Sequence, residues 1–249
     1  MIQRLLLLAL VLMTTAGAKP IHALVLSGNN NHDWRTTTPY LVSELLESGE
    51  FIVTVVYNPE HLQGVDLGKV DVLVSDWNAI GLGDDAEWSE ETQQAYVDFV
   101  KNGGGHVVVH AGSSSFIEWE DYQKICLSTW KEGQTGHGPH HEFKVKLEEH
   151  AITAGIEPFS IKDELWHKVE VAENATAIAF AWSGAEFGGT DKWEPVAFVG
   201  QFGKGRCYNI TLGHHVAGEN ESLLNPNFVK LFLRGTEWAA SGKVERFAN

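Results

Sequence analysis

The fold class depends on one short stretch of the sequence, Gly103-Gly104-Gly105-His106-Val107-Val108-Val109-His110-Ala111-Gly112-Ser113. Residues 106–110 form an apolar run of the kind found in strands that are buried on both faces. The glycines before it end a predicted helix, which Ser89 caps and which carries acidic residues in its first turn. A buried strand that follows such a helix is typical of a parallel sheet, and His110 marks its carboxyl end.

The rest of the chain repeats this alternation of strands and helices. Apolar runs predict strands at 21–27, 51–57 and 70–75, and a period of 3.6 residues predicts helices at 36–48, 117–127 and 227–240. Later strands are expected at 142–147, 159–171 and 175–182, with a hairpin formed by 195–201 and 206–212. The predicted fold class is therefore α/β: a three-layer sandwich with a mostly parallel central sheet, followed by a C-terminal β-hairpin and a helix.

The composition is that of a globular protein and excludes several functional classes. Of the 249 residues, 43% are hydrophobic and 20% charged, which rules out collagen-like and disordered chains. Thirty-three Asp and Glu against 18 Lys and Arg give a formal charge of -15, which repels phosphate backbones and anionic lipid. We therefore expect no nucleic-acid partner. No linker or internal repeat divides residues 19–249, so we expect a single domain.

The first 18 residues have the pattern of a secretory signal peptide. Arg4 supplies a positive charge, residues 5–13 are apolar, and Ala16-Gly17-Ala18 is a small-residue cleavage site. The apolar run is shorter than the ~20 residues that a transmembrane helix needs, and no later segment is long and apolar enough. We expect a secreted, periplasmic protein without a membrane span.

The two cysteines allow two interpretations. Cys126 and Cys207 could form a disulfide in an oxidising compartment, but a count of two is weak evidence. Cys207 falls in a strand pattern and Cys126 in a helical one, which favours two buried free thiols.

Several short motifs occur in a fixed order from about residue 21 to residue 242. They are His32-Asp33-Trp34, the stretch 103–111, Asp163-Glu164-Leu165-Trp166, Pro195-Val196-Ala197, Gly203-Lys204-Gly205-Arg206, Leu212-Gly213-His214 and Trp238-Ala239-Ala240. Together they resemble the ThuA-like family, named for trehalose utilisation, which usually has Tyr in the place of Trp166. The resemblance implies a flavodoxin-like sandwich similar to class I glutamine amidotransferases. It also implies a role in carbohydrate metabolism, particularly of trehalose and 3-keto-disaccharides.

The turn after the strand at 106–110 excludes two catalytic mechanisms. A glutamine amidotransferase needs a Cys in this turn, and His110-Ala111-Gly112-Ser113 has none. A serine hydrolase needs a second Gly, which the sequence Gly112-Ser113-Ser114-Ser115-Phe116 lacks. We interpret Ser113 as part of a polar helix-capping cluster that also lines the pocket.

Histidines at the ends of predicted strands are the strongest signal of a functional site. Ligands of an open parallel sheet bind beyond the carboxyl ends of its strands, which is where His32, His110 and His214 fall. We expect these three and Glu164, from the Asp-Glu-Leu-Trp motif, to meet as the catalytic residues. Two roles stay open: the three histidines bind a divalent metal such as zinc, or the site performs acid/base chemistry without a metal.

Further residues are candidates for binding a small-molecule sugar, because sugar rings stack on aromatic planes and bond polar groups. They are Asp33, Trp34, Trp77, Ser113, His140, Trp166 and His215. The Gly- and His-rich loop at 136–141 could close over the pocket. The expected function is an enzyme that isomerises, eliminates from or hydrolyses a (3-keto-)disaccharide or related sugar. The alternative is a carbohydrate-binding module without catalysis.

We predict that residues 1–18 are removed on export, so that the mature protein begins near Lys19. The small residues Ala16 and Ala18 are those that signal peptidases accept before the cleaved bond. N-terminal sequencing of the exported protein measures the cleavage point. An exported chain that still begins with Met1 would contradict the prediction.

Overall fold

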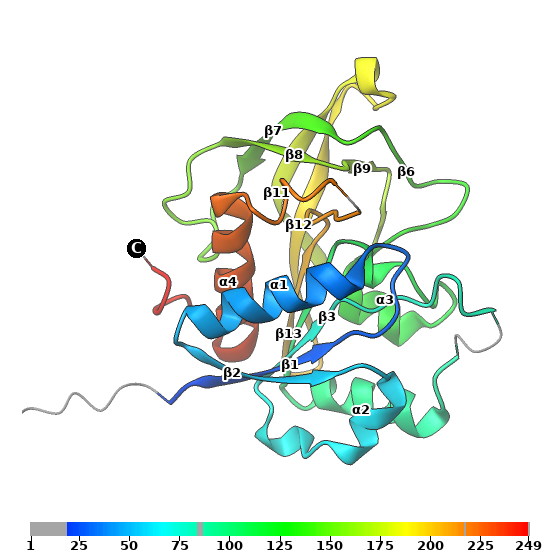
Figure 1. Cartoon of the computed structure of the whole chain (residues 1–249), viewed down its shortest axis with the longest axis vertical. Coiled ribbons are helices and arrows are strands. Elements are labelled where there is room, and N and C mark those ends of the chain that lie inside the picture. The colour runs from blue at the N-terminus through cyan, green and yellow to red at the C-terminus, as the bar shows by residue number, and fades with distance from the viewer. Residues whose placement is uncertain (1–18, 84–86, 217, 249) are drawn as a thin grey trace, which may run out of the picture.

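A nine-stranded mixed sheet organises the chain, which the computed structural model describes over residues 19–83, 87–216 and 218–248 (Figure 1). The strand order is β2-β1-β3-β4-β13-β12-β11-β7-β8. Strands from distant parts of the sequence are neighbours in this order, with Cys207 of β13 opposite His106 of β4. The predicted signal peptide, 1–18, lies outside the described residues.

One half of the sheet is parallel, as the sequence predicts. It contains β2 (Phe51–Val56), β1 (Ile21–Leu26), β3 (Val72–Ser75), β4 (Gly105–Val109) and β13 (Gly205–Ile210). All five residues of β4 are buried, because strands flank it on both sides and helices cover both faces. Its carboxyl end therefore lies at the same edge as those of β1, β3 and β13.

The other half of the sheet is antiparallel. β12 (Lys192–Phe202) pairs with β13 in the predicted hairpin, and β11 (Ala175–Ser183), β7 (His141–Leu147) and β8 (Phe159–Asp163) follow. Residues 141–145 of β7 alternate between buried and exposed side chains. This half of the sheet therefore has one face in the core and one face in water.

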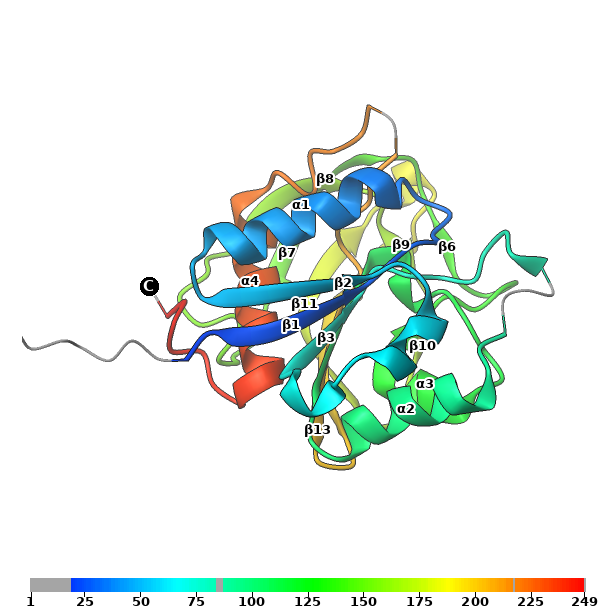
Figure 2. The same ribbon diagram turned by 60° about the horizontal axis from the view of Figure 1, so that its bottom comes forward.

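Helices cover both faces of the parallel half (Figure 2). α1 (Trp34–Glu47) and α4 (Pro226–Ser241) pack on one face, and α2 (Glu90–Lys101) and α3 (Glu120–Cys126) pack on the other. The predicted cap of α2 is present, because the Ser89 hydroxyl accepts the N–H of Thr92. The predicted three-layer α/β sandwich is confirmed.

The single strand expected at 159–171 is wrong, because this segment breaks into three. β8 ends at Asp163, β9 (Trp166–His167) pairs with β6 (Gly136–His137), and β10 (Glu170–Val171) pairs with β5 (Ser128–Thr129). The break begins where the buried carboxylate of Asp163 accepts the N–H of Glu164 at 2.7 Å. Lys168 then adopts a φ of 55°, which no strand residue has. Both deviations turn the chain away from the main sheet.

Short 3-10 helices complete the described structure at Pro59–Gly64, Leu67–Lys69, His110–Ser113 and Ala185–Phe187. Cys126 and Cys207 are buried and free, the interpretation that the sequence favoured.

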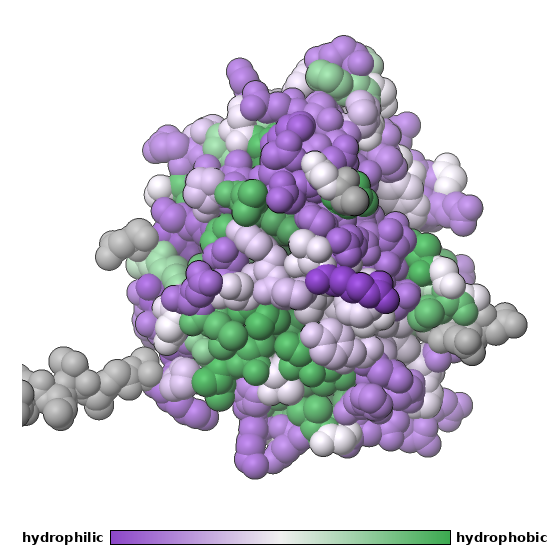
Figure 3. Space-filling view, viewed as in Figure 1, coloured by the Kyte–Doolittle hydropathy of each residue, from purple (hydrophilic) through white to green (hydrophobic). Residues whose placement is uncertain are grey.

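Within the described ranges, no helix combines the length and apolarity needed to cross a membrane. Figure 3 shows an apolar area over the edge strand β2, where Ile52 is 48% and the neighbouring Tyr57 55% exposed.

Gly235 allows α4 to lie directly against β13, which generates a test of the packing. A Cβ at Gly235 would come within 2.1 Å of the Tyr208 ring, which is fully buried. Alanine has a higher helix propensity by ~1 kcal/mol. We nevertheless expect Gly235→Ala to lower the free energy of unfolding by about 1–3 kcal/mol, because the interface is overpacked. Chemical denaturation measures the change, with Lys230→Ala on the same helix as the control, and a stabilised Gly235→Ala variant would contradict it.

Candidate active site

Four predicted site residues, His32, His110, Glu164 and His214, meet at the carboxyl edge of the parallel strands. One nitrogen or oxygen atom of each lies within 4.8 Å of the corresponding atoms of the other three. The His32 ring centre is 4.7 Å from that of His110 and 4.8 Å from that of His214. The four residues follow β1, β4, β8 and β13, so the sheet brings together segments that are far apart in the sequence.

His110 occupies a strained turn directly after β4. Its φ is 43°, a value that few residues other than glycine adopt but that histidine tolerates better than most. Gly112 completes the turn, because a Cβ there would lie 2.6 Å from the carbonyl oxygen of Ser75. Backbone strain of this kind persists where the surrounding structure holds it, often at functional sites.

The hydrogen bonds of His110 leave one ring nitrogen free. Its Nδ1 donates to the carbonyl oxygen of Thr211 at 2.7 Å, so the proton is on Nδ1. Its Nε2 is buried without a partner and lies 3.8 Å from Glu164 Oε1. Burial, together with the neighbouring His32 and His214, holds the pKa of His110 well below its usual range. At neutral pH this imidazole is uncharged and its Nε2 lone pair faces the cluster.

The other two imidazoles are also neutral. Burial lowers the pKa of His32 to about 3, with a smaller contribution from His214. Burial also lowers the pKa of His214, although Glu164 and Glu219 oppose the shift. His214 Nδ1 lies 3.6 Å from Glu164 Oε2, and neither this nitrogen nor His32 Nδ1 has a hydrogen-bond partner.

Glu164 is oriented by two side chains that the sequence places in separate segments. Trp166 Nε1 donates to its Oε1 at 3.0 Å, and His137 Nδ1 lies 3.2 Å from its Oε2. His137 is the more exposed partner, because 44% of its side chain is accessible. The carboxylate therefore faces both the buried cluster and the solvent-accessible loop at 136–141.

Asp163 connects the strands that carry Glu164 and His214. Its fully buried carboxylate accepts the N–H groups of Glu164, Gly213 and His214 at 2.7, 2.9 and 3.2 Å, and the Ser222 hydroxyl. Burial raises the pKa of Asp163 to about 7, against the lowering effect of these bonds. The four hydrogen-bond donors around its two oxygens favour the ionised form of Asp163. A protonated carboxyl group would carry an O–H hydrogen that meets only donors here.

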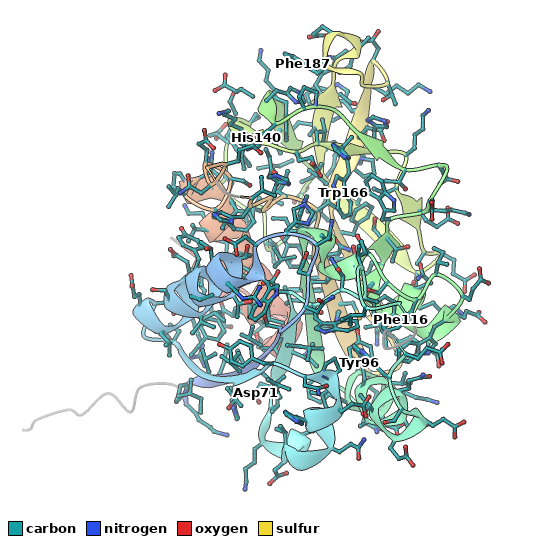
Figure 4. All side chains as sticks on the ribbon, turned by 45° about the vertical axis from the view of Figure 1, so that its right-hand side comes forward. Asp71, Tyr96, Phe116, His140, Trp166 and Phe187 are labelled. Atoms are coloured by element: carbon teal, nitrogen blue, oxygen red, sulfur yellow. The ribbon has the colours of Figure 1, made fainter. Side chains whose placement is uncertain are left out.

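A cavity of about 280 Å³ opens beside the cluster. Its lining includes His32, His137 and Glu164 together with Trp130, Trp166 and Ser114. The two tryptophan rings meet edge to face with their centres 5.2 Å apart. Figure 4 shows Trp166 and His140 in the half of the molecule that lies away from Asp71. The cavity combines aromatic walls with a few polar groups, which is the usual composition of a small-molecule site.

Two predicted sugar-binding residues lie near the cluster, and two others do not line the cavity. Trp166 lines the cavity, and the His140 ring is buried 5.6 Å from the His214 ring. Ser113 was predicted to line the pocket, but it is fully buried and its hydroxyl donates to the His110 carbonyl oxygen; Ser114 takes its place. Trp77 is buried in the core, because its ring packs against Trp88 and Phe116 on the face of the sheet that α2 and α3 cover.

The remaining three candidates, Asp33, Trp34 and His215, do not line the cavity and lie around the start of α1, where the Asp33 N–H donates to the His215 carbonyl oxygen. Asp33 accepts the Thr36 hydroxyl at 2.8 Å and lies 3.9 Å from His215 Nδ1. The Trp34 ring packs against Tyr57 and under the Arg35 guanidinium.

Sequence reasoning missed Asp163, Trp130 and Glu219 as site residues. Asp163 stands in the quoted Asp-Glu-Leu-Trp motif, but a buried carboxylate that binds backbone N–H groups leaves no pattern in the sequence. Trp130 precedes a loop and resembles the other tryptophans. Glu219 Oε2 lies 3.3 Å from His214 Nε2, a contact that only the tertiary structure creates.

Three neutral imidazoles and one carboxylate form a donor set that fits a divalent transition metal. Four atoms that bind one Zn²⁺ tetrahedrally at 2.0–2.2 Å lie roughly 3.3–3.6 Å from one another. The longest spacing in this cluster, up to 4.8 Å, therefore has to contract by roughly 1 Å or slightly more when an ion binds. The free buried nitrogens of His32, His110 and His214 are the atoms that such an ion would use.

Comparisons with known proteins agree with this fold. A family model described as ThuA, trehalose utilisation, matches residues 22–239. A ThuA-like protein from Parabacteroides merdae ATCC 43184 is 29% identical, with a TM-score of 0.81 over 91% of this chain and 92% of that one. A ThuA-like protein from Bacteroides uniformis ATCC 8492 has a TM-score of 0.68 at 13% identity, over 93% and 97% of the two chains, which is a similarity of fold alone. The chain has no significant match among curated proteins. Because the family model covers nearly the whole described chain, this protein belongs to the ThuA family.

Proposed function

We propose that this protein is a metal-dependent enzyme that acts on a sugar, with His32, His110, Glu164 and His214 as the metal ligands. The observation that carries the proposal is the convergence of three unpartnered, neutral ring nitrogens and one carboxylate beside a cavity with tryptophan walls. The trehalose-utilisation family favours a carbohydrate as the substrate. The pattern of residues 1–18 supports export as part of the same proposal.

A metal explains the polar atoms of the site better than a metal-free arrangement does. A buried nitrogen without a partner costs about 1–3 kcal/mol, and this site contains three. A metal-ligating histidine commonly donates its second N–H to a backbone carbonyl, as His110 does to Thr211. With three nitrogen donors and one oxygen donor, Zn²⁺ or a similar ion is preferred over Mg²⁺ or Ca²⁺.

The chain supplies the remaining functions of an active site. A bound divalent ion would act as a Lewis acid toward a carbonyl or hydroxyl oxygen of the sugar. Trp130 and Trp166 offer aromatic planes for the C–H face of the ring. His137 borders the cavity and lies 3.2 Å from Glu164, so it can accept a proton from the substrate.

The reaction that suits these groups is proton removal from a carbon next to a carbonyl. In a 3-keto sugar, His137 would take the proton from C2. Breaking the C1–O bond then forms a double bond between C1 and C2, and the departing oxygen receives the proton as an alcohol. His137 as the base, with a bound ion supplying Lewis acidity, would replace the pair of carboxylates that an ordinary glycosidase uses.

We expect His110→Ala to lose bound metal and turnover while the protein remains folded. The variant removes one ligand and should weaken metal affinity by at least ~10-fold. The matched control is His106→Ala, which removes another fully buried histidine from the same part of the chain. His106 bonds Tyr96 instead of the cluster, so its loss should lower stability and leave the metal in place. Elemental analysis, thermal melts and turnover of 3-keto-trehalose are measured on each preparation.

Two results would overturn the proposal in different ways. Wild-type protein that binds no divalent ion but converts the sugar would assign the site to metal-free acid/base chemistry. Protein that binds the sugar without converting it, with or without metal, would assign the chain to the binding-module alternative.

Asp163→Asn tests whether the buried carboxylate positions two of the ligands. The amide places an NH₂ group against backbone N–H donors, so Glu164 and His214 lose their common anchor. We expect metal affinity to fall about 10–100-fold, as measured by Zn²⁺ titration. The control is Glu237→Gln, because Glu237 is also buried and accepts two backbone N–H groups, those of Glu245 and Arg246, away from the site. If both variants lose the same stability and both keep the metal affinity of the wild type, Asp163 has a purely structural role.

A further inference from the structure

We propose that the solvent-facing side of the antiparallel half carries a second carbohydrate-binding site, separate from the metal centre. It is an aromatic groove of about 360 Å³, lined among others by Glu142, Lys144, Trp182, Glu186, Phe187 and Trp193. None of these residues lines the cavity beside the metal centre. The choice of a sugar as its ligand rests on the proposed function.

Two adjacent tryptophans line the aromatic groove. Trp182 of β11 is paired in register with Trp193 of β12, and each is 39% exposed. Their ring centres lie 5.7 Å apart with the planes at 67°. Two indole planes that meet at a steep angle form a corner, and the C–H faces of a saccharide fit against such surfaces. Lys146 Nζ lies 5.0 Å from the Trp193 ring centre, a contact that favours this orientation of the ring.

The hairpin between β11 and β12 adds a third aromatic wall. Phe187, which Figure 4 labels at the far end of this hairpin, is 36% exposed. Its ring stacks on that of His141 with the centres 4.0 Å apart and the planes at 22°. The stacking attaches the hairpin to the start of β7, so the wall is held in place by the sheet.

The aromatic groove is continuous with the loop that reaches the metal centre. A Cβ on Gly138 would lie 2.1 Å from the Phe187 carbonyl oxygen, so the hairpin rests directly on the loop at 136–141. The same loop carries His137 and His140, which face Glu164 and His214. A saccharide bound in the groove therefore contacts elements that also border the active site.

The polar groups of the groove favour a neutral, hydroxyl-rich ligand. Glu142 and Glu186 provide hydrogen-bond acceptors and Lys144 provides donors. Sugar hydroxyls serve as both donors and acceptors, so they match this mixed set. A nucleotide or another phosphate-bearing ligand would meet two carboxylates here and a formal charge of -15 on the chain.

The test is a calorimetric titration of the whole protein with maltoheptaose and with trehalose, two neutral glucose saccharides. We expect binding of at least one of them by the wild type. Trp182→Ala and Trp193→Ala should each weaken it about 3- to 10-fold, the effect of losing one aromatic stacking contact. The control is Tyr57→Ala, since Tyr57 is 55% exposed on the parallel side of the sheet and its loss should not change affinity.

Metal content, measured on the same samples, separates this proposal from the proposed function. His110→Ala should lose metal and retain saccharide binding in the groove. Wild-type protein that contains metal but binds neither saccharide would overturn the proposed groove site and leave the proposed function standing. Unchanged saccharide affinity in both tryptophan variants would have the same meaning. Sedimentation provides a further check: a dimer that Trp182→Ala converts to monomer, without saccharide binding, would assign this surface to contact between two copies of the chain.

Discussion

Burial of β4 on both faces is the constraint on which the rest of the structure depends. The strand is flanked by β3 and β13 and covered by helices, so every side chain must tolerate a packed environment. Gly105 permits this packing, because a Cβ there would lie 2.5 Å from the Ala239 backbone of α4. The chain can leave such a strand only in a tight turn, and the turn places His110 at a φ of 43°. The imidazole is thus held by the most rigid part of the sheet, where a functional group is positioned best.

The antiparallel half contributes the remaining parts of the site through one buried carboxylate. Asp163 ends β8 at the edge of the sheet, yet it binds the N–H groups of Gly213 and His214 in the loop after β13. This bridge brings Glu164 and Trp166 over the carboxyl edge of the parallel strands. Burial then keeps the imidazoles of His32 and His110 neutral. Neutral imidazoles have a free lone pair and can bind a metal ion, whereas protonated ones cannot.

Much of the fold could be predicted from local patterns. Apolar runs located β1 to β4, Ser89 marked the start of α2, and the ends of parallel strands indicated that His32, His110 and His214 would meet. The patterns failed where long-range contacts decide the backbone. Residues 159–171 read as one strand, but Asp163 and Lys168 divert the chain. Trp77 follows a strand at the correct edge, yet its ring packs into the α2–α3 layer.

The sequence alone was sufficient to place the histidines at one edge, because strands that alternate with helices run parallel and their carboxyl ends therefore lie at the same edge of the sheet. The tertiary structure was needed for everything that depends on contact between distant segments. The free Nε2 of His110 requires the Thr211 carbonyl, which is 101 residues away along the chain. The cavity walls join Trp130 to Trp166, and the aromatic groove joins Phe187 to His141. Such contacts arise from side-chain packing across the fold, and no local pattern of residues encodes them.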